Sequence, residues 1–285
     1  MRLLTRYGYL LGIFSSLVLT LPQSRASTWN VDANGSWGSS GNWSAGVPNS
    51  AGAQADLTFD ITADRTVSIE LNKFAGVVNI GDTSNQYIFT NDGSWKALRM
   101  DNNGAGAQFN VLANSSVLFD SASGTVNLIA LETLTITLNT GSTLTFGGNG
   151  VLDGETNDLI ITGPGNLTTP TLAGTGTITK NGTGTVTLTG DNDYNGGALV
   201  LNGGNWVVQG TNQTTNATVG NGAVLDLTSV GGSMKSLTSL TIDAGGQVVL
   251  GAHGNGNVGG NNFGTQQIGN ANSAGLAVTM QSKAE

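Results

Sequence analysis

The chain contains no cysteine, which excludes a disulfide framework, thiol catalysis and every cysteine-based metal site. Its single histidine, His253, excludes multi-histidine metal cages and leaves one candidate base for a Ser-His-Asp arrangement. Only 10% of the residues are charged, and the net charge of −8 argues against nucleic acid and anionic membrane surfaces as partners. Glycine is abundant instead, at 44 of 285 residues, and 38% of the chain is hydrophobic, so the composition differs from that of a disordered protein.

The segment 1–26 has the three parts of a secretory signal peptide. Met1–Arg6 carries two arginines, Tyr9–Leu21 is apolar, and small residues stand at positions −3 and −1 of a cut between Ala26 and Ser27. The apolar run is shorter than the roughly 20 residues of a membrane span. We therefore predict cleavage after Ala26 and an exported mature chain without a membrane span. Cleavage leaves 7 basic against 18 acidic residues, a mature charge of −11.

The mature chain has the pattern of an all-β protein. Apolar residues alternate with threonine in short runs, which places the apolar side chains on one face of a half-buried strand. The clearest runs are Thr133–Leu138, Thr143–Phe146, Thr177–Thr179, Thr185–Thr189, Val224–Leu227 and Leu240–Ile242. Gly-Gly, Asn-Gly and Asp-Gly pairs between the runs supply the positive φ angles of tight turns. No window after Leu21 has a helical apolar period.

The regular spacing favours a β-solenoid over a sandwich or a barrel. Short strand-like runs recur at short intervals along most of the mature chain, without a long crossover or a change in composition. We predict a single-stranded, right-handed parallel β-helix over 56–285, preceded by a Trp-rich N-terminal cap over 27–55. Asparagine side chains at the turns are expected to form hydrogen-bonded ladders from coil to coil.

Residues 174–204 carry a resemblance to a known family. The stretch Gly174–Gly197, GTGTITKNGTGTVTLTGDNDYNGG, followed by Leu199–Leu201 and Gly203-Gly204, resembles the autotransporter-associated β-strand repeat. Ile178 and Val186 stand where that family usually has leucine. From physical reasoning alone, each glycine lies at a turn or at a close approach of a neighbouring coil, Lys180 caps an exposed corner, and Tyr194 packs over a turn.

The N-terminal stretch Thr28–Trp37, followed by Gly41–Pro48, resembles the opening module often seen in such repeat proteins. The resemblance implies an exported, surface-associated, passenger-like β-helical body from a Gram-negative-type bacterium. Autotransporters proper end in a translocator barrel, whereas this chain ends at Gln281–Glu285. We therefore expect either release after export or a longer parent protein.

Three tryptophans, Trp29, Trp37 and Trp43, cluster near the start of the mature chain. They could stack on sugar rings, or they could cover the open end of the solenoid. We favour the cap, because the exposed end of a solenoid requires a covering segment. Trp95 and Trp206 stand alone, which is typical of core or surface packing.

Other motifs carry little chemistry. Residues 254–259 satisfy G-x-G-x-x-G, but no helix begins there to hold a pyrophosphate. Gly147–Asp153 approaches a calcium-binding nonapeptide, but its aspartate is one residue late and no tandem copy follows. Asp191 and Asp193 could supply carboxylates, and turn formation is their simpler role. We predict no catalytic residues, no cofactor and no bound metal.

Two classes of function remain. We favour a non-catalytic, exported, adhesin-like scaffold at the cell surface, with polysaccharide or other cell-surface components as partners. The alternative is a β-helical polysaccharide lyase or hydrolase, or a carbohydrate-binding module. An enzyme needs carboxylates that meet in one groove. The candidates to examine are Asp153, Asp158, Asp191, Asp193, Asp226 and Asp243.

Overall fold

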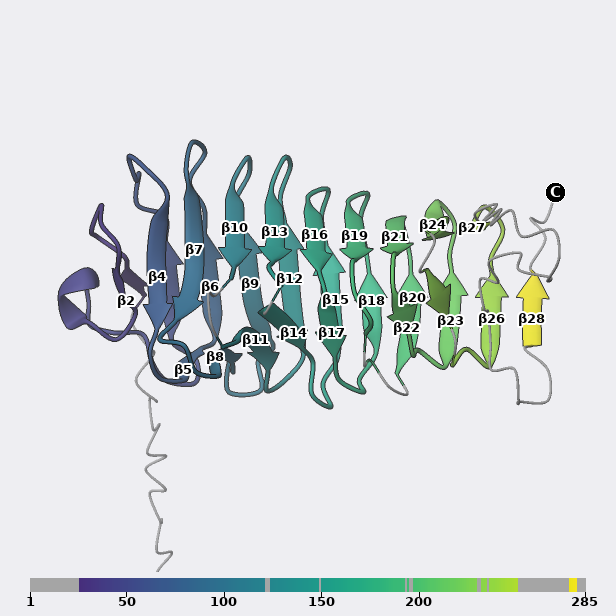
Figure 1. The fold of residues 1–285 in the computed structure, drawn as a ribbon, viewed down its shortest axis with the longest axis horizontal. Helices are drawn as coiled ribbons and strands as arrows, with labels where there is room; N and C mark the ends of the chain where they lie inside the picture. The colour runs from purple at the N-terminus through teal and green to yellow at the C-terminus, as the bar shows by residue number, and fades with distance from the viewer. Residues whose placement is uncertain are drawn as a thin grey trace, which may run out of the picture.

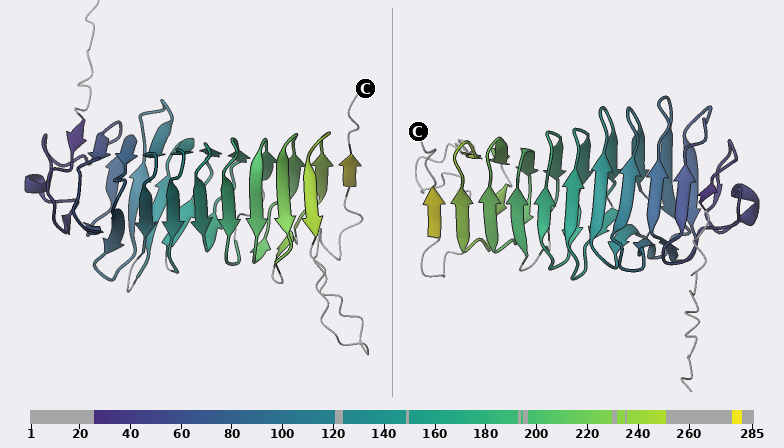
Figure 2. Two further views of the ribbon diagram at one scale, coloured as in Figure 1. Left: turned by 90° about the horizontal axis from the view of Figure 1, so that it is seen from above. Right: turned by 180° about the vertical axis from the view of Figure 1, so that it is seen from behind.

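The computed structural model describes residues 26–120, 124–148, 150–192, 194, 197–229, 232–234, 236–250 and 277–280. The chain winds into a parallel β-helix of about eight turns across these residues (Figure 1). Each coil adds one strand to each of two long sheets, and many coils add a strand to a third sheet. The coils wind in the right-handed sense, the hand that parallel crossovers strongly prefer (Figures 1 and 2). The predicted fold class is confirmed.

Sheet 1 runs the length of the molecule on the side that faces the viewer in the right panel of Figure 2. Its strands are paired in parallel throughout. They are β1 (Ser27–Thr28), β3 (Gln54–Leu57), β6 (Val77–Ile80), β9 (Ala107–Val111), β12 (Leu134–Leu138), β15 (Leu159–Thr162), β18 (Ile178–Lys180), β20 (Ala198–Leu201), β23 (Asn216–Val219), β26 (Ser239–Ile242) and β28 (Ala277–Met280).

Sheet 2 lies opposite sheet 1 across the core, and its strands run the other way along the page in Figure 1. They are β2 (Gly35–Ser36), β4 (Arg65–Ile69), β7 (Gln86–Asn91), β10 (Ser116–Phe119), β13 (Thr143–Phe146), β16 (Asn166–Thr169), β19 (Thr185–Leu188), β21 (Gly204–Val208), β24 (Ala223–Leu227) and β27 (Gln247–Leu250). The alternating runs predicted at 143–146, 185–189 and 224–227 form strands of this sheet.

Sheet 3 closes the third side of the coils. Its strands are β5 (Lys73–Ala75), β8 (Lys96–Met100), β11 (Val126–Ala130), β14 (Gly150–Asp153) and β17 (Thr171–Ala173). Beyond β17, Asn192 and Asn212 form an isolated parallel bridge, and β22 (Thr211–Asn212) pairs with β25 (Ser233–Met234). The Asn192 side chain accepts a hydrogen bond from the amide of Leu172 in β17 at 2.7 Å. Asparagine side chains therefore connect the coils on the third side beyond the last strand of sheet 3.

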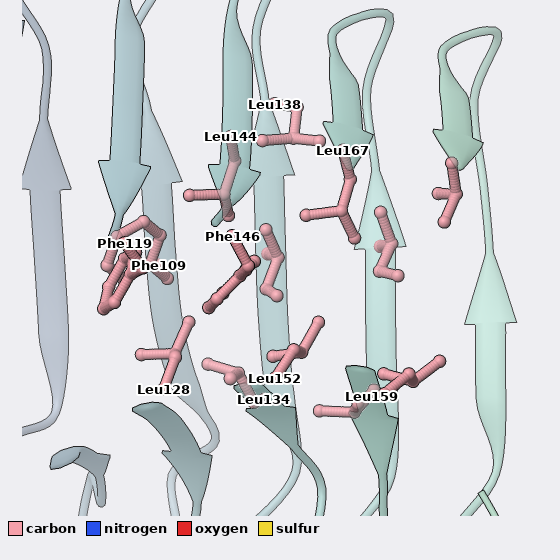
Figure 3. Packing of buried hydrophobic residues seen from close by; sticks show 14 of the residues in the cluster. Phe109, Phe119, Leu128, Leu134, Leu138, Leu144, Phe146, Leu152, Leu159 and Leu167 are labelled. Atoms are coloured by element: carbon pink, nitrogen blue, oxygen red, sulfur yellow. The ribbon is translucent and has the colours of Figure 1, made fainter. Parts of the chain in front are cut away.

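The core is a column of stacked apolar side chains between the sheets. Phe89, Phe119 and Phe146 lie in register on sheet 2, and their ring centroids are 4.5 and 4.9 Å apart. Leucines from all three sheets line the core around these rings and beyond them, as Figure 3 shows for Leu128, Leu144 and Leu159. Period-two alternation produces this column because successive side chains of a strand point to opposite faces.

Asparagine ladders are present, as predicted, and they occur on a strand face as well as at a corner. On sheet 1, Asn110 donates to Asn79 at 2.9 Å, and Asn79 donates to Asp56 at 2.8 Å. At a corner, Asn202 donates to Asn181 at 2.8 Å. These bonds link successive coils outside the core.

The N-terminal segment covers the first coil. The short 3-10 helix η1 (Ser40–Asn42) lies at the N-terminal end of the molecule in Figure 1. Trp29, Trp37 and Trp43 are all buried, at 0, 0 and 4% exposure. Their rings form edge contacts, and the Trp37 ring reaches Phe89 at 6.2 Å. The three tryptophans therefore extend the aromatic core and present no ring face for sugar stacking.

Candidate functional site

A polar cleft of about 270 Å³ opens at the corner between sheets 1 and 2. Three successive coils contribute to it. The first coil supplies Asp64, just before β4, the second supplies residues 82–86 between β6 and the start of β7, and the third supplies Asn114 and Ser116 between β9 and the start of β10. Its lining is polar throughout: Asp64, Asp82, Thr83, Ser84, Asn85, Gln86, Asn114 and Ser116.

Asp82 is the most buried carboxylate of the cleft, at 8% exposure. It accepts hydrogen bonds from the backbone amides of Ser84 at 2.8 Å, Asn85 at 2.7 Å and Ile61 at 3.1 Å. Burial by itself raises the pKa of this carboxyl, but the three amide donors outweigh burial and hold the pKa below its ordinary value. Asp82 is therefore ionised at neutral pH and anchors the loop. A general acid for glycoside cleavage would need the opposite shift.

The other acidic residue of the cleft also bonds to backbone. Asp64 stands directly before β4 and accepts the amide of Gln86, the first residue of β7 in the next coil, at 2.8 Å. Both carboxylates of the cleft are therefore engaged by backbone amides that hold the chain in place.

The contact made by Asp64 recurs along the helix. Asp158 accepts the Thr177 amide at 2.7 Å, and Asp191 accepts the Thr211 amide at 2.8 Å. Asn166 accepts the Thr185 amide at 2.9 Å. In each case a side chain at or just before the start of one strand or bridge accepts the amide at or just before the start of the strand in the next coil. The sequence predicted turn formation for Asp191, and the structure shows that this side chain joins two coils.

Of the six carboxylates proposed as a test for an enzyme, the five that the structure describes are spread over more than one side of the coils. Asp153 lies on sheet 3, Asp226 lies on sheet 2, and Asp243 follows a strand of sheet 1. Asp153 and Asp226 each accept an amide two residues ahead, from Glu155 and Thr228. Asp193 lies outside the described residues. The five that are described do not gather in one groove.

Glycines of the 174–204 repeat stack directly on the coil before them. A Cβ atom built on Gly184 would lie 1.8 Å from the carbonyl oxygen of Gly165, and one on Gly176 would lie 2.1 Å from that of Asn157. Backbone occupies the space that a side chain would need. The prediction that these glycines mark close approaches of neighbouring coils is confirmed.

The prediction for Lys180 is wrong. Its side chain does not cap an exposed corner, because it points inward and is only 1% exposed. The ammonium group donates to the carbonyl oxygens of Gly182 at 3.0 Å and of Asn181 and Gly203 at 3.3 Å, which lie in two successive coils. Burial lowers the pKa of this lysine. Period-two alternation places Lys180 on the same inward face as Ile178, and the expectation of an exposed corner rested on its charge. Only the folded corner shows the carbonyl oxygens that receive the ammonium group.

The remaining predicted positions are placed as follows. Tyr194 is fully buried and pairs with Gly174 of the preceding coil. Ser27 is buried in β1, where its hydroxyl donates to the Gly46 carbonyl at 2.7 Å, and Ala26 precedes it. Residues 1–25, His253 and the glycine motif at 254–259 lie outside the described residues.

Sequence reasoning missed Asp82. The signal for it was the stretch Gly81–Asn85, GDTSN, in which an aspartate precedes small polar residues, as in a turn closed by a side chain.

In comparisons with known proteins, no family model, no curated protein and no solved structure matches this chain. Within the described residues, no group of three or more histidine, cysteine or acidic side chains is arranged to hold a metal ion. The same part of the chain contains no helix long and apolar enough to span a membrane.

Proposed function

We propose that this chain is the β-helical body of an exported, non-catalytic protein that displays polar faces at the cell surface and mediates adhesion there. The resemblance of residues 174–204 to the autotransporter-associated repeat and the signal-peptide pattern of residues 1–26 support export. Partners in this proposal are polysaccharide or other cell-surface components.

The observation that carries the proposal is that several aspartate carboxylates bind backbone amides of neighbouring coils. Asp64, Asp82, Asp158 and Asp191 each accept a backbone amide from a neighbouring coil. Glycoside cleavage instead needs two carboxyl groups about 5–10 Å apart on either side of the scissile bond, one of them held protonated. Carboxylates committed to holding coils together favour a scaffold over an enzyme.

The architecture supports the same proposal. Successive coils add side chains to long outer rows on sheets 1 and 2, and these rows include polar ladders such as that from Asp56 through Asn79 to Asn110. A row of similar groups at the strand spacing of about 4.8 Å suits many weak contacts with an extended partner.

The test has two arms. Purified protein is incubated with acidic and neutral polysaccharides, and new reducing or unsaturated ends are measured against a boiled sample and a known lyase. We expect no new ends, and sustained cleavage would overturn the non-catalytic proposal. In the second arm, intact producing cells are treated with protease. We expect loss of the chain from intact cells, whereas complete protection until lysis would contradict surface display.

A further inference from the structure

An exposed apolar patch lies where sheet 2 leads into sheet 3, and we call it the Trp95 patch. Trp95, just before β8, is 49% exposed, and Leu71, before β5 in the preceding coil, is 67% exposed. The register of β5 with β8 places these residues on adjoining coils, because Lys73 lies opposite Leu98. The Ala97 amide donates to the Asn72 side chain at 3.0 Å and holds the two corners together.

Arg99 supplies a positive charge to the patch. It lies between Leu98 and Met100, which both point into the core, so its side chain leaves the outer face of sheet 3. The guanidinium carbon lies 5.8 Å from the centroid of the Trp95 ring. Within the described part of the chain, Arg99 makes neither an ion pair nor a hydrogen bond, and its Nε atom is buried without a partner.

Nearby acidic groups do not neutralise Arg99. Asp92 is engaged by Lys96, at 3.7 Å, and by the Ser94 hydroxyl, at 2.7 Å. Glu70 accepts the hydroxyl of Ser36 at 2.7 Å. Asp153 lies two strands away from Arg99 across Ile129, which is about 10 Å at the spacing of strands in a sheet.

Polar atoms without partners adjoin the same patch on β11. Asn127 lies opposite Ala97 on the outer face of sheet 3 and is only 3% exposed, yet its Oδ1 atom accepts no hydrogen bond from the described residues. The hydroxyl of Thr125, just before β11, is likewise buried and has no hydrogen-bond partner among those residues. Both atoms retain hydrogen-bonding capacity beside the patch.

We propose that the Trp95 patch binds a uronate-bearing segment of an acidic polysaccharide, a proposal that rests on the surface-adhesion function above and names its partner. The apolar face of a sugar ring packs on the exposed part of the indole. The uronate carboxylate receives two parallel hydrogen bonds from the planar guanidinium, a geometry that a lysine ammonium does not match. The mature chain predicted above carries a charge of −11, so the rest of its surface repels a polyanion, and the attraction has to come from Arg99 within the patch.

The experiment measures binding of galacturonic acid oligomers of one defined length by titration calorimetry, with neutral maltooligosaccharides of the same length as the comparison. We expect the wild type to bind the uronate oligomer and not the neutral one. Trp95→Ala and Arg99→Gln should each weaken binding by about tenfold or more, and Arg99→Lys should recover only part of the loss.

Lys96→Gln is the matched control, because it removes a positive charge from the same corner that is already paired with Asp92. It should change the affinity less than about threefold. Circular dichroism confirms that each variant is folded. The proposal is overturned by absence of binding, by equal binding of the neutral oligomer, or by equal losses in Lys96→Gln and Arg99→Gln. Cleavage of the oligomer would instead contradict the non-catalytic function and leave the binding site standing.

Discussion

Replacement of Gly184 by alanine tests whether glycine is required by the approach of neighbouring coils. The new Cβ would lie 1.8 Å from the Gly165 carbonyl oxygen, whereas ordinary contacts begin near 3.4 Å, so the two coils have to move apart. Backbone atoms form the obstacle, and no rotamer change can remove it.

The cost follows from the bonds that such a separation strains. The Gly184 amide donates to the Gly163 carbonyl oxygen at 3.2 Å, and the Thr185 amide donates to the Asn166 side chain at 2.9 Å. Loss of both at about 1 kcal/mol each, with about 1–3 kcal/mol for overpacking, predicts a decrease of about 3–5 kcal/mol in the free energy of unfolding.

Two other glycines separate this clash from backbone strain. Gly104 has a φ of +81° and open space around its Cβ position, so Gly104→Ala should cost about 1 kcal/mol through strain alone. Gly41 has neither a positive φ nor any atom within 4 Å, so Gly41→Ala should change stability by less than about 0.5 kcal/mol.

The assay is urea unfolding followed by far-ultraviolet circular dichroism, with the three variants compared in one buffer. Coil stacking is refuted as the reason for glycine if Gly184→Ala unfolds within about 0.5 kcal/mol of the wild type. Equal decreases in the free energy of unfolding for Gly184→Ala and Gly104→Ala would show that backbone conformation, and not contact between coils, determines the cost of replacing glycine.

Three further predictions concern buried side chains. Lys180→Met keeps the stem and removes the ammonium from three carbonyl oxygens, and should lower the free energy of unfolding by about 1–3 kcal/mol in urea melts; an unchanged value would contradict a role for those bonds. Burial raises the pKa of Tyr87, so above pH ~10 the folded state keeps a proton that the unfolded state loses, and the free energy of unfolding should fall as the pH rises. Tyr87→Phe should reduce the slope of the free energy of unfolding against pH by the equivalent of about one proton. An identical slope in the variant and the wild type would contradict this prediction. Trp37→Ala removes a buried ring that also donates to the Pro48 carbonyl at 2.8 Å and should cost about 3–5 kcal/mol, whereas the exposed Trp95→Ala should cost less than about 1 kcal/mol; similar losses would argue against a packed cap.

The fold class could be read from local sequence because its causes are local. Alternation of threonine with leucine, isoleucine or valine decides which side chains of a strand are buried, and glycine pairs decide where the chain turns. The alternating runs at 133–138, 143–146, 177–179, 185–189, 224–227 and 240–242 therefore became β12, β13, β18, β19, β24 and β26, with nearly the same ends. The burial of Trp29, Trp37 and Trp43 was predictable for a related reason, since an open solenoid end must be covered.

The roles of individual polar residues depended on tertiary structure. On sheet 1, Leu199 lies opposite Ala217 in the next coil, whereas Val77 lies opposite Gln108, so the earlier coil is much longer than the later one. Because coil length varies, sequence spacing does not reveal which residues lie one above another. Only the stacked coils show which carbonyl oxygens receive the ammonium of Lys180 and that the guanidinium of Arg99 lies beside Trp95. Sequence by itself determined the strands and the solenoid, through the two-residue period of strands, and the tertiary structure decided the contacts, through the register between coils.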